Sequence, residues 1–141
     1  MEDIMTDIGQ LIKRANNSLN KDMNQFASQY GLTGTQMSFI DFIARHDQHQ
    51  VGQRAIEDEF NIRRSTTTTI LQRMSARQLI TRSNSAVDRR QKVVQLSPQG
   101  ERLVPIVQQY IADHENHFLA NHSHQEVALF RQMLTEISKE D

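Results

Sequence analysis

The spacing of apolar residues changes abruptly between residues 53 and 96, and this change limits what the chain can fold into. Over residues 53–60 and 64–78, apolar side chains recur at the intervals of an amphipathic helix. Asn61 lies between these segments and suits a left-handed turn. Two helices joined by about three residues form a helix-turn-helix. The pattern alone is not specific, because many helical bundles contain similar corners.

The residues that follow alternate with the period of β-strands. Residues 79–82 and 92–96 are predicted to be two short strands. A β-hairpin of this kind beside a helix-turn-helix is a wing. The expected fold is therefore mainly α, a winged helix-turn-helix with a two-stranded β wing and flanking helices at both ends. The polar loop between the strands, residues 83–91, includes three consecutive charged side chains: Asp88, Arg89 and Arg90.

Two further helices are expected before the helix-turn-helix. Apolar residues recur at helical spacing over residues 4–30, and the glycine at Gly31 is a common helix stop. Thr33 and Gln36 then fit a capping box, in which each side chain satisfies a free backbone donor at the start of the next helix. The polar residues 46–53 are expected to form a connection after that helix.

The last third of the chain is predicted to be helical. Ser97 and Pro98 suit the N-cap and the first position of a long helix, which Pro105 should bend. Residues 121–123 separate it from a final helix. The terminal helices carry more apolar residues than one small lobe can cover, so we expect them to pair with a second copy of the chain.

Length and composition agree with a single globular domain. A chain of 141 residues with 37% hydrophobic and 23% charged residues can bury a core. We expect a lobe over residues 33–97 that contains the winged helix-turn-helix and a helical dimerisation region over residues 1–31 and 98–141. The acidic N-terminus lacks the features of a secretory signal, and no apolar run is long enough to span a membrane, which favours a cytoplasmic protein.

The charges are strongly segregated, although the net charge is only −1. Residues 60–97 contain eight basic residues and one acid, a net charge of +7, whereas the remainder of the chain carries −8. A basic face on an acidic body suits docking on phosphates. Seven of the eight basic residues are arginines, which can form bidentate contacts to phosphate and guanine. A solvated, arginine-rich surface is the alternative interpretation.

Residues 63–73, RRSTTTTILQR, are the first candidates for contact with DNA. Threonine disfavours helices, so a helix with four in succession should use their hydroxyl groups, which can meet phosphates or base edges. We expect Thr67 to face the core and Ser65 to cap the helix or contact a phosphate. Arg73 suits a phosphate or an internal pair. The other candidates in this segment are Arg63, Arg64, Thr66, Thr68 and Thr69.

The hairpin loop supplies a second set of candidates. Arg89 and Arg90 suit a minor groove, whose negative potential attracts guanidinium groups. Asp88 is unexpected at a surface that meets DNA, but a carboxylate can hold a neighbouring guanidinium in place through a fork-like pair. An ordinary charged, mobile loop is the alternative interpretation.

These motifs resemble the MarR family of bacterial transcription regulators. The stretch DRRQKVVQLSPQGERL, residues 88–103, looks like the wing-and-exit signature of that family. Asp88 and Arg90 match its Asp-x-Arg pair, and Leu96 and Ser97 precede a helix that contains a matching glycine, Gly100. The stretch LTGTQMSFI near the second helix also looks like the family's opening of that helix. The order of elements agrees over nearly the whole chain.

The resemblance implies a function as well as a fold. It implies a homodimer that binds a pseudo-palindromic operator, usually as a repressor, with the recognition helix in the major groove and Arg90 in the minor groove. Small aromatic or phenolic ligands commonly release such proteins from DNA. Two residues depart from the pattern: Gln78 stands where the family usually has glycine, and Arg63 where a small capping residue is common. These departures bear on the helix ends.

Other functional classes find little support in the sequence. The absence of cysteine excludes disulfides and thiolate sites. His114 and His117 share a helical face, but two histidines are an incomplete zinc site, so surface histidines are the preferred interpretation and no metal or cofactor is expected. No motif for phosphate binding or catalysis indicates an enzyme. A helical interaction module without DNA binding is the rival, but it leaves the basic segment unexplained.

Overall fold

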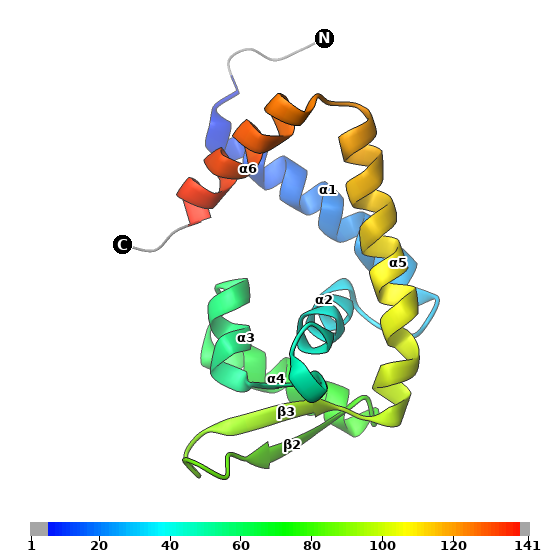
Figure 1. Ribbon diagram of the computed structural model, residues 1–141, viewed down its shortest axis with the longest axis vertical. Helices are drawn as coiled ribbons and strands as arrows, with labels where there is room; N and C mark the ends of the chain where they lie inside the picture. The colour runs from blue at the N-terminus through cyan, green and yellow to red at the C-terminus, as the bar shows by residue number, and fades with distance from the viewer. Residues whose placement is uncertain (1–5, 139–141) are drawn as a thin grey trace. The chain divides into compact units, whose positions relative to one another are not determined.

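The structure, a computed structural model, describes residues 6–138, and these form a mainly helical protein with one small sheet. The part of the predicted first helix that includes Ile4 lies outside the described residues. The chain divides into two compact units between Val104 and Pro105. The elements (Figure 1) are α1 (Ile8–Ser28), α2 (Gly34–Ala44), η1 (Asp47–His49), β1 (Gln50–Gly52), α3 (Gln53–Phe60), α4 (Arg64–Ala76), β2 (Ile80–Asn84), β3 (Lys92–Leu96), α5 (Pro98–Ala120) and α6 (His124–Ser138).

Local side-chain chemistry sets the boundary between α1 and α2. The predicted capping box is present: Thr33 Oγ1 accepts a hydrogen bond from the backbone N–H of Gln36, and Gln36 Oε1 accepts one from that of Thr33, each at 3.1 Å. Gly31 follows α1 with a φ of 69°, a left-handed conformation that glycine adopts without strain. The predicted helix stop and the next helix start are both confirmed.

The helix-turn-helix consists of α3 and α4. α3 ends at Asn61, whose φ of 51° and ψ of 50° make the predicted left-handed turn. α4 ends at Ala76 rather than at Gln78 as predicted, because the backbone of Gln78 is left-handed, with a φ of 63°. The next N–H, that of Leu79, returns to the carbonyl oxygen of Met74 at 3.0 Å. This turn into the hairpin explains why glycine suits the position that Gln78 occupies.

Gln78 offers a test of this backbone strain. A side chain in the left-handed region destabilises the native state by roughly 1–2 kcal/mol, while glycine adds roughly 0.5–1 kcal/mol of entropy to the unfolded chain. We therefore expect Gln78→Gly to raise the free energy of unfolding by about 0.5 kcal/mol, measured by urea denaturation. Ser75→Gly, inside α4, is the control and should lower it by about 0.5–1 kcal/mol. If the Gln78→Gly protein were less stable than the parent, the backbone of Gln78 would not be strained.

The wing belongs to a three-stranded antiparallel sheet with the strand order β1-β3-β2. β2 and β3 form the predicted hairpin, in which Ile80 lies opposite Leu96, and β2 extends to Asn84. β1 is a correction, since Gln50–Gly52 falls within the stretch expected to be a connection, and it pairs with the other edge of β3. Three residues, of which only Val51 is buried, are too few for an alternating pattern to be recognised.

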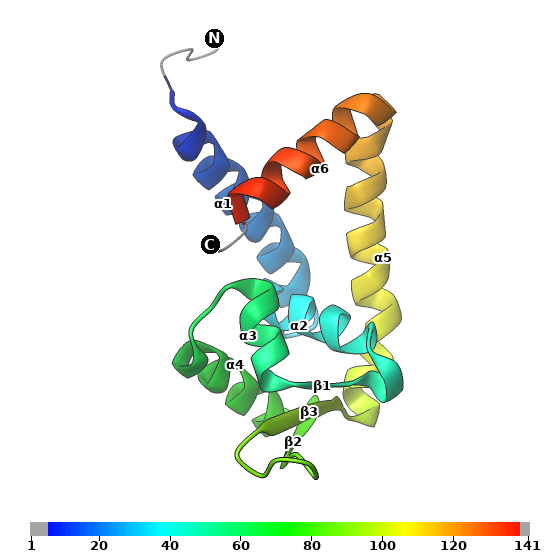
Figure 2. The ribbon, with the colours of Figure 1, turned by 60° about the vertical axis from the view of Figure 1, so that its left-hand side comes forward.

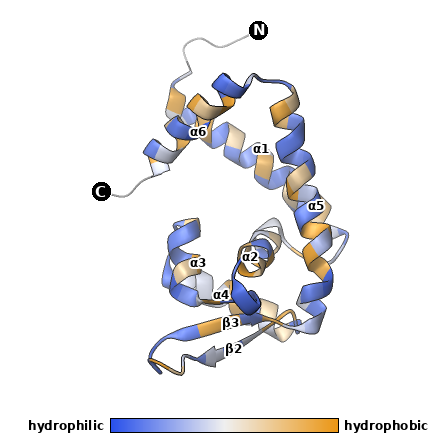
Figure 3. Cartoon of the chain, in the orientation of Figure 1, coloured by the Kyte–Doolittle hydropathy of each residue, from blue (hydrophilic) through white to orange (hydrophobic). Residues whose placement is uncertain are grey.

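One apolar core joins the sheet to α2, α3 and α4. These three helices gather on one side of the sheet, and the hairpin loop extends beyond them (Figures 1 and 2). β3 is hydrophobic where it passes the helices and hydrophilic near the hairpin loop (Figure 3). The core therefore sets the position of the hairpin relative to α4. Its fully buried side chains include Met37, Phe39, Ile40, Ile43, Ile56, Leu71, Met74, Ile80 and Val94.

The first turn of α5 is held at the base of the hairpin. Ser97 caps the helix as predicted, since its Oγ accepts a hydrogen bond from the backbone N–H of Gly100 at 3.2 Å. The N–H of Ser97 donates to the carbonyl oxygen of Leu79, and a Cβ on Gly100 would overlap that same oxygen. On the next residue, Glu101 Oε1 lies 2.7 Å from His49 Nδ1. The close approach of the Leu79 carbonyl oxygen to the backbone of α5 therefore requires glycine at position 100.

The second unit contains the remainder of α5 and α6. The predicted break at residues 121–123 is confirmed, and the rings of Phe118 and Phe130 stack across it with centroids 5.6 Å apart. A capping box of Ser123 and Glu126 starts α6, with hydrogen bonds of 2.8 and 3.1 Å. The Ser-x-x-Glu spacing in the sequence is the signal that would have identified this box.

Candidate nucleic-acid interface

The N-terminal end of α4 lies at the surface of the first unit. Arg63 is the N-cap residue, and its side chain makes no capping hydrogen bond. The expectation that Ser65 caps the helix is wrong, because the extended backbone already ends at Arg63, with a ψ of 152°. Ser65 instead lies in the first helical turn, where its carbonyl oxygen accepts a hydrogen bond from Thr69 Oγ1 at 3.1 Å. The side chains of Arg63, Arg64 and Ser65 are all exposed.

The four threonines of α4 differ in their surroundings. Thr67 is fully buried, as predicted, and its hydroxyl donates to the carbonyl oxygen of Arg63 at 3.1 Å. Thr66 and Thr69 are exposed, and Thr68 is half-buried. Thr69 donates its hydroxyl proton within the helix, whereas Thr68 accepts a hydrogen bond from another helix. Thr68 and Thr69 therefore offer different hydrogen-bonding groups to a ligand.

Gln53, the first residue of α3, connects α4 to the hairpin, and the sequence analysis did not identify it. Although polar, it is only 5% exposed. Its Nε2 donates to Thr68 Oγ1 at 2.9 Å and to Glu57 Oε2 at 3.2 Å, and its Oε1 accepts from Arg82 Nη2 at 3.1 Å. One amide thus joins α3, α4 and β2. Nothing in the sequence pattern separates a buried glutamine at a helix start from an exposed one.

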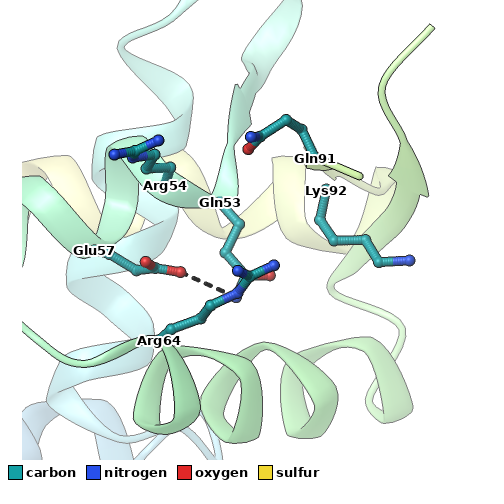
Figure 4. A pocket seen from close by; sticks show the side chains of 6 residues that line it. All are labelled: Gln53, Arg54, Glu57, Arg64, Gln91 and Lys92. Atoms are coloured by element: carbon teal, nitrogen blue, oxygen red, sulfur yellow. Dashed lines mark hydrogen bonds between the residues drawn. The ribbon is translucent and has the colours of Figure 1, made fainter. Parts of the chain in front are cut away.

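An open pocket of about 340 Å³ lies beside Gln53, between α3, the start of α4 and the start of β3. Figure 4 shows that side chains from all three segments border it. Three cations and one carboxylate give the lining a net positive charge. Arg54 lies outside the basic segment recognised in the sequence, so the pocket extends the basic surface onto α3. Besides Gln53, the lining consists of Arg54, Glu57, Arg64, Gln91 and Lys92.

The hairpin loop holds Asp88 and Arg90 in the predicted fork. Arg90 Nε donates to Asp88 Oδ1 at 3.2 Å, and Arg90 Nη2 donates to Asp88 Oδ2 at 3.3 Å. The Arg90 side chain remains 90% exposed, so the pair orients the guanidinium without burying it. The side-chain hydrogen bond from Arg90, followed by that from its backbone N–H, lowers the pKa of Asp88 from the usual value.

The lowered pKa of Asp88 predicts how the loop responds to acid. A depressed native pKa means that the fork stabilises the loop above the ordinary pKa of aspartate and loses this effect as pH falls through the lowered value. We expect a ¹³C NMR titration to give the Asp88 carboxyl a pKa below the usual value in the native protein and one closer to the usual value in Arg90→Ala. Arg89→Ala is the control and should leave the titration unchanged. An equal change of the Asp88 pKa in both variants would contradict a specific interaction between Asp88 and Arg90.

The remaining basic candidates differ in exposure. Arg73 and Arg89 are exposed, and Arg82 is half-buried. Arg82 Nη2 meets the neutral amide of Gln53, and no described residue accepts a hydrogen bond from the buried Arg82 Nε. The amide of Gln53 carries no charge and so does not neutralise Arg82. Arg82 therefore adds positive charge to the surface around the pocket. The helix start, the pocket and the hairpin loop thus form one basic surface on the first unit.

Comparison with known proteins shows to which family this chain belongs. Residues 30–91, from just after α1 to the end of the hairpin loop, match the model of the MarR family. The transcription regulator MarR from Oenococcus oeni PSU-1 is 35% identical, with 93% of this chain and 98% of that chain covered and a TM-score of 0.82. The chain belongs to the MarR family. The resemblance predicted from the hairpin residues is therefore confirmed, and this MarR-family chain is a transcription regulator with a winged helix-turn-helix.

Two more distant MarR-type structures share the fold. MepR of S. aureus, in a complex with DNA, is 20% identical and has a TM-score of 0.85, with 94% of this chain and 96% of that chain covered. BpsR of Bordetella bronchiseptica, whose DNA binding is regulated by 6-hydroxynicotinic acid, is 21% identical and has a TM-score of 0.81, with 100% and 99% covered. The fold of the MarR-family chain is thus one that is also found bound to DNA.

Within residues 6–138, none of the helices combines the length and the apolar character that a membrane span needs. In the same residues no three histidine, aspartate or glutamate side chains are grouped so that they could hold a metal ion. His114, one of the two histidines considered for zinc, packs against the ring of Tyr110, with centroids 4.4 Å apart.

Proposed function

We propose that this protein binds a pseudo-palindromic DNA operator as a homodimer and represses transcription in the cytoplasm. Residues 33–97 are the DNA-binding lobe of each protomer, and residues 1–31 and 98–141 are the dimerisation region. The N-terminal half of α4 enters the major groove, and the hairpin loop reaches the minor groove. Two such lobes related by a two-fold axis imply half-sites about one helical turn apart, roughly 10 base pairs.

One observation carries this proposal: the start of α4 and the hairpin loop present their cations from a single packed lobe. The threonines contact phosphates or base edges, Ser65 and the arginines of α4 contact phosphates, and Arg90 enters the minor groove with Asp88 as its support. Arg54 and Lys92 of the pocket add contacts to phosphate. The residues proposed to contact or support contact with DNA are Arg63, Arg64, Ser65, Thr66, Thr68, Thr69, Arg73, Asp88, Arg89 and Arg90.

Exposed apolar side chains support pairing of two protomers. None of the described residues of α6 is buried, and five of its large apolar side chains are 40–60% exposed. Covering them with a second copy removes apolar surface from water, at about 25 cal/mol per Å². On α6 these residues are Leu129, Phe130, Met133, Leu134 and Ile137, and α1 exposes Ile8, Leu11 and Leu19.

We expect light scattering to give a mass about twice the chain's 16.3 kDa at micromolar concentration. Leu134→Glu should shift the protein towards monomer, because it places a charge in the proposed apolar interface. Gln132→Glu introduces the same charge on the same helix and is the matched control, which should remain dimeric. A monomer mass for the parent protein would remove the homodimer from the proposal.

The regulation of BpsR by 6-hydroxynicotinic acid supports an effector for this protein as well. We further propose that a small aromatic or phenolic ligand releases this protein from DNA. Adding 6-hydroxynicotinic acid and simple phenols to the preformed protein–DNA complex should reduce the fluorescence anisotropy of labelled DNA. Benzylamine, which is aromatic but cationic, is a suitable control. Retention of the complex with every anionic and phenolic compound would contradict this part of the proposal.

Fluorescence anisotropy against the protein's own upstream DNA, with a scrambled duplex beside it, tests the function itself. We expect tighter binding to the upstream DNA and a linear fall of log K with log salt, since cations released from phosphates drive much of the binding. In vitro transcription from the bound promoter should then decrease, and an increase would indicate an activator. Failure to bind either duplex at low salt would overturn DNA binding and favour a helical interaction module.

A further inference from the structure

The two charged partners of Gln53 determine the orientation of its amide group. The guanidinium of Arg82 has only hydrogen-bond donors, so the oxygen Oε1 of Gln53 must face it. The carboxylate of Glu57 has only acceptors, so the nitrogen Nε2 must face that side. The second N–H of Nε2 is then directed at Thr68 Oγ1, 2.9 Å away. Thr68 therefore accepts a hydrogen bond from Gln53.

This orientation decides where the hydroxyl proton of Thr68 can go. Thr67 and Thr69, its neighbours on α4, each donate their proton to the carbonyl oxygen four residues earlier. Thr68 makes no such bond, and no residue in the described part of the chain accepts its proton. Because Thr68 is half-buried beside the exposed face of α4, its hydroxyl remains a donor for a group outside the chain.

We propose that Gln53 is a positioning residue that fixes the Thr68 hydroxyl as a hydrogen-bond donor to an acceptor atom of DNA. The acceptor is a phosphate oxygen or a base-edge nitrogen or oxygen, which share this chemistry. Thr69, whose proton is already used, offers only a lone pair and a methyl group. The inference rests on the proposed DNA binding and adds to it the direction of one contact.

Exchanging two side chains tests the proposal without changing the net charge. In the double variant Gln53→Glu with Glu57→Gln, the group at position 53 can only accept, so the Thr68 proton turns inward to it, while the new amide at position 57 can donate to the same carboxylate. The probe is a duplex selected from a random library by the parent protein. We expect the affinity for this duplex to fall about tenfold. Binding to an unselected duplex should stay the same if the acceptor is a base edge and should fall with it if the acceptor is a phosphate oxygen.

Two variants of Thr68 separate positioning from a merely structural role. Thr68→Val removes the hydroxyl and should lose about the same tenfold, whereas Thr68→Ser should retain affinity. In the Thr68→Val background the exchange at positions 53 and 57 should cause no further loss, because no hydroxyl is left to turn. An additive loss in that background, or full affinity of Thr68→Val, would overturn the proposal.

Modified duplexes distinguish the two sources of the acceptor. If the acceptor is a phosphate oxygen, the penalty of Thr68→Val disappears on a duplex with a methylphosphonate at the contacted position. If it is a base-edge nitrogen or oxygen, the penalty disappears on a duplex in which a base analogue lacks that atom, such as 7-deazaguanine for N7 or 2-aminopurine for the O6 of guanine. A penalty unchanged on every such duplex, tested one position at a time across the half-site, would contradict a direct contact. Failure of the parent protein to select any duplex would instead refute the proposed function.

Discussion

Arg90→Ala is expected to weaken binding to the selected duplex by at least tenfold, the largest loss among the single basic residues of the loop. The fork with Asp88 already holds the exposed guanidinium in one orientation, so little side-chain freedom is lost on binding. An arginine contact contributes roughly 1–3 kcal/mol, and a homodimer loses it twice. Fluorescence anisotropy over a salt series would measure the affinity and should show a shallower salt dependence.

Arg14→Ala is the matched control for this loss. It removes the same charge from an exposed position on α1, outside the basic surface, and should change the affinity little. Asp88→Asn tests orientation, because it loosens the fork while the guanidinium remains. It also removes a negative charge, which by itself would favour binding, so weaker binding would show the effect of orientation. We expect it to bind more weakly than the parent but more tightly than Arg90→Ala. Equal affinities of Arg90→Ala and Arg14→Ala would contradict the role of the hairpin loop in DNA binding.

Gly100→Ala is expected to lower the free energy of unfolding by about 3 kcal/mol and the unfolding midpoint by about 10 °C. The added Cβ would overlap the carbonyl oxygen of Leu79, which is a backbone atom already bonded to the N–H of Ser97. Relief requires moving either the base of the hairpin or the start of α5, and the contact of Glu101 with His49 opposes the second movement. Thermal denaturation followed by circular dichroism would measure the change.

Gly9→Ala provides the comparison for Gly100. Its Cβ would come within 3.3 Å only of Asp7 Oδ1, a side-chain atom that caps α1 by accepting from the backbone N–H of Gln10, and Gly9 lies in the first turn of α1. Alanine favours a helix over glycine by up to about 1 kcal/mol, so the stability should stay the same or rise slightly. An unfolding midpoint of Gly100→Ala equal to that of the parent would show that the carbonyl of Leu79 can move aside.

The elements that the sequence predicted correctly are those whose ends depend on neighbouring residues. Thr33 and Gln36 cap each other three residues apart, Asn61 turns its own backbone, and Ser97 caps the helix it precedes. Such signals need only a few residues of chain, and here the tertiary structure agrees with them. The hairpin was predicted in the same way from the strand pattern of residues 79–82 and 92–96, and the fork of the loop from two residues that are two positions apart.

The misplaced features depend on partners that are distant in the chain. β1 is recognisable only when β3 lies beside it, since three residues carry no period of their own. Ser65 suits a cap by residue type, but the path of the chain into α4 starts the helix before it. Gln53 looks like an ordinary polar residue until Thr68 and Arg82 are brought to its amide, fifteen and twenty-nine positions away.

The sequence by itself determined the winged helix-turn-helix and the segregation of positive charge onto it, because periodicity, capping and charge are properties of short segments. The family was indicated by the resemblance of residues 88–103 to a known signature. The tertiary structure alone decided which polar groups are left for a ligand. Whether the hydroxyl of Thr68 donates or accepts depends on an amide from another helix, whose own direction depends on a carboxylate and a guanidinium. Hydrogen-bond direction is a property of the assembled network, and only packing brings that network together.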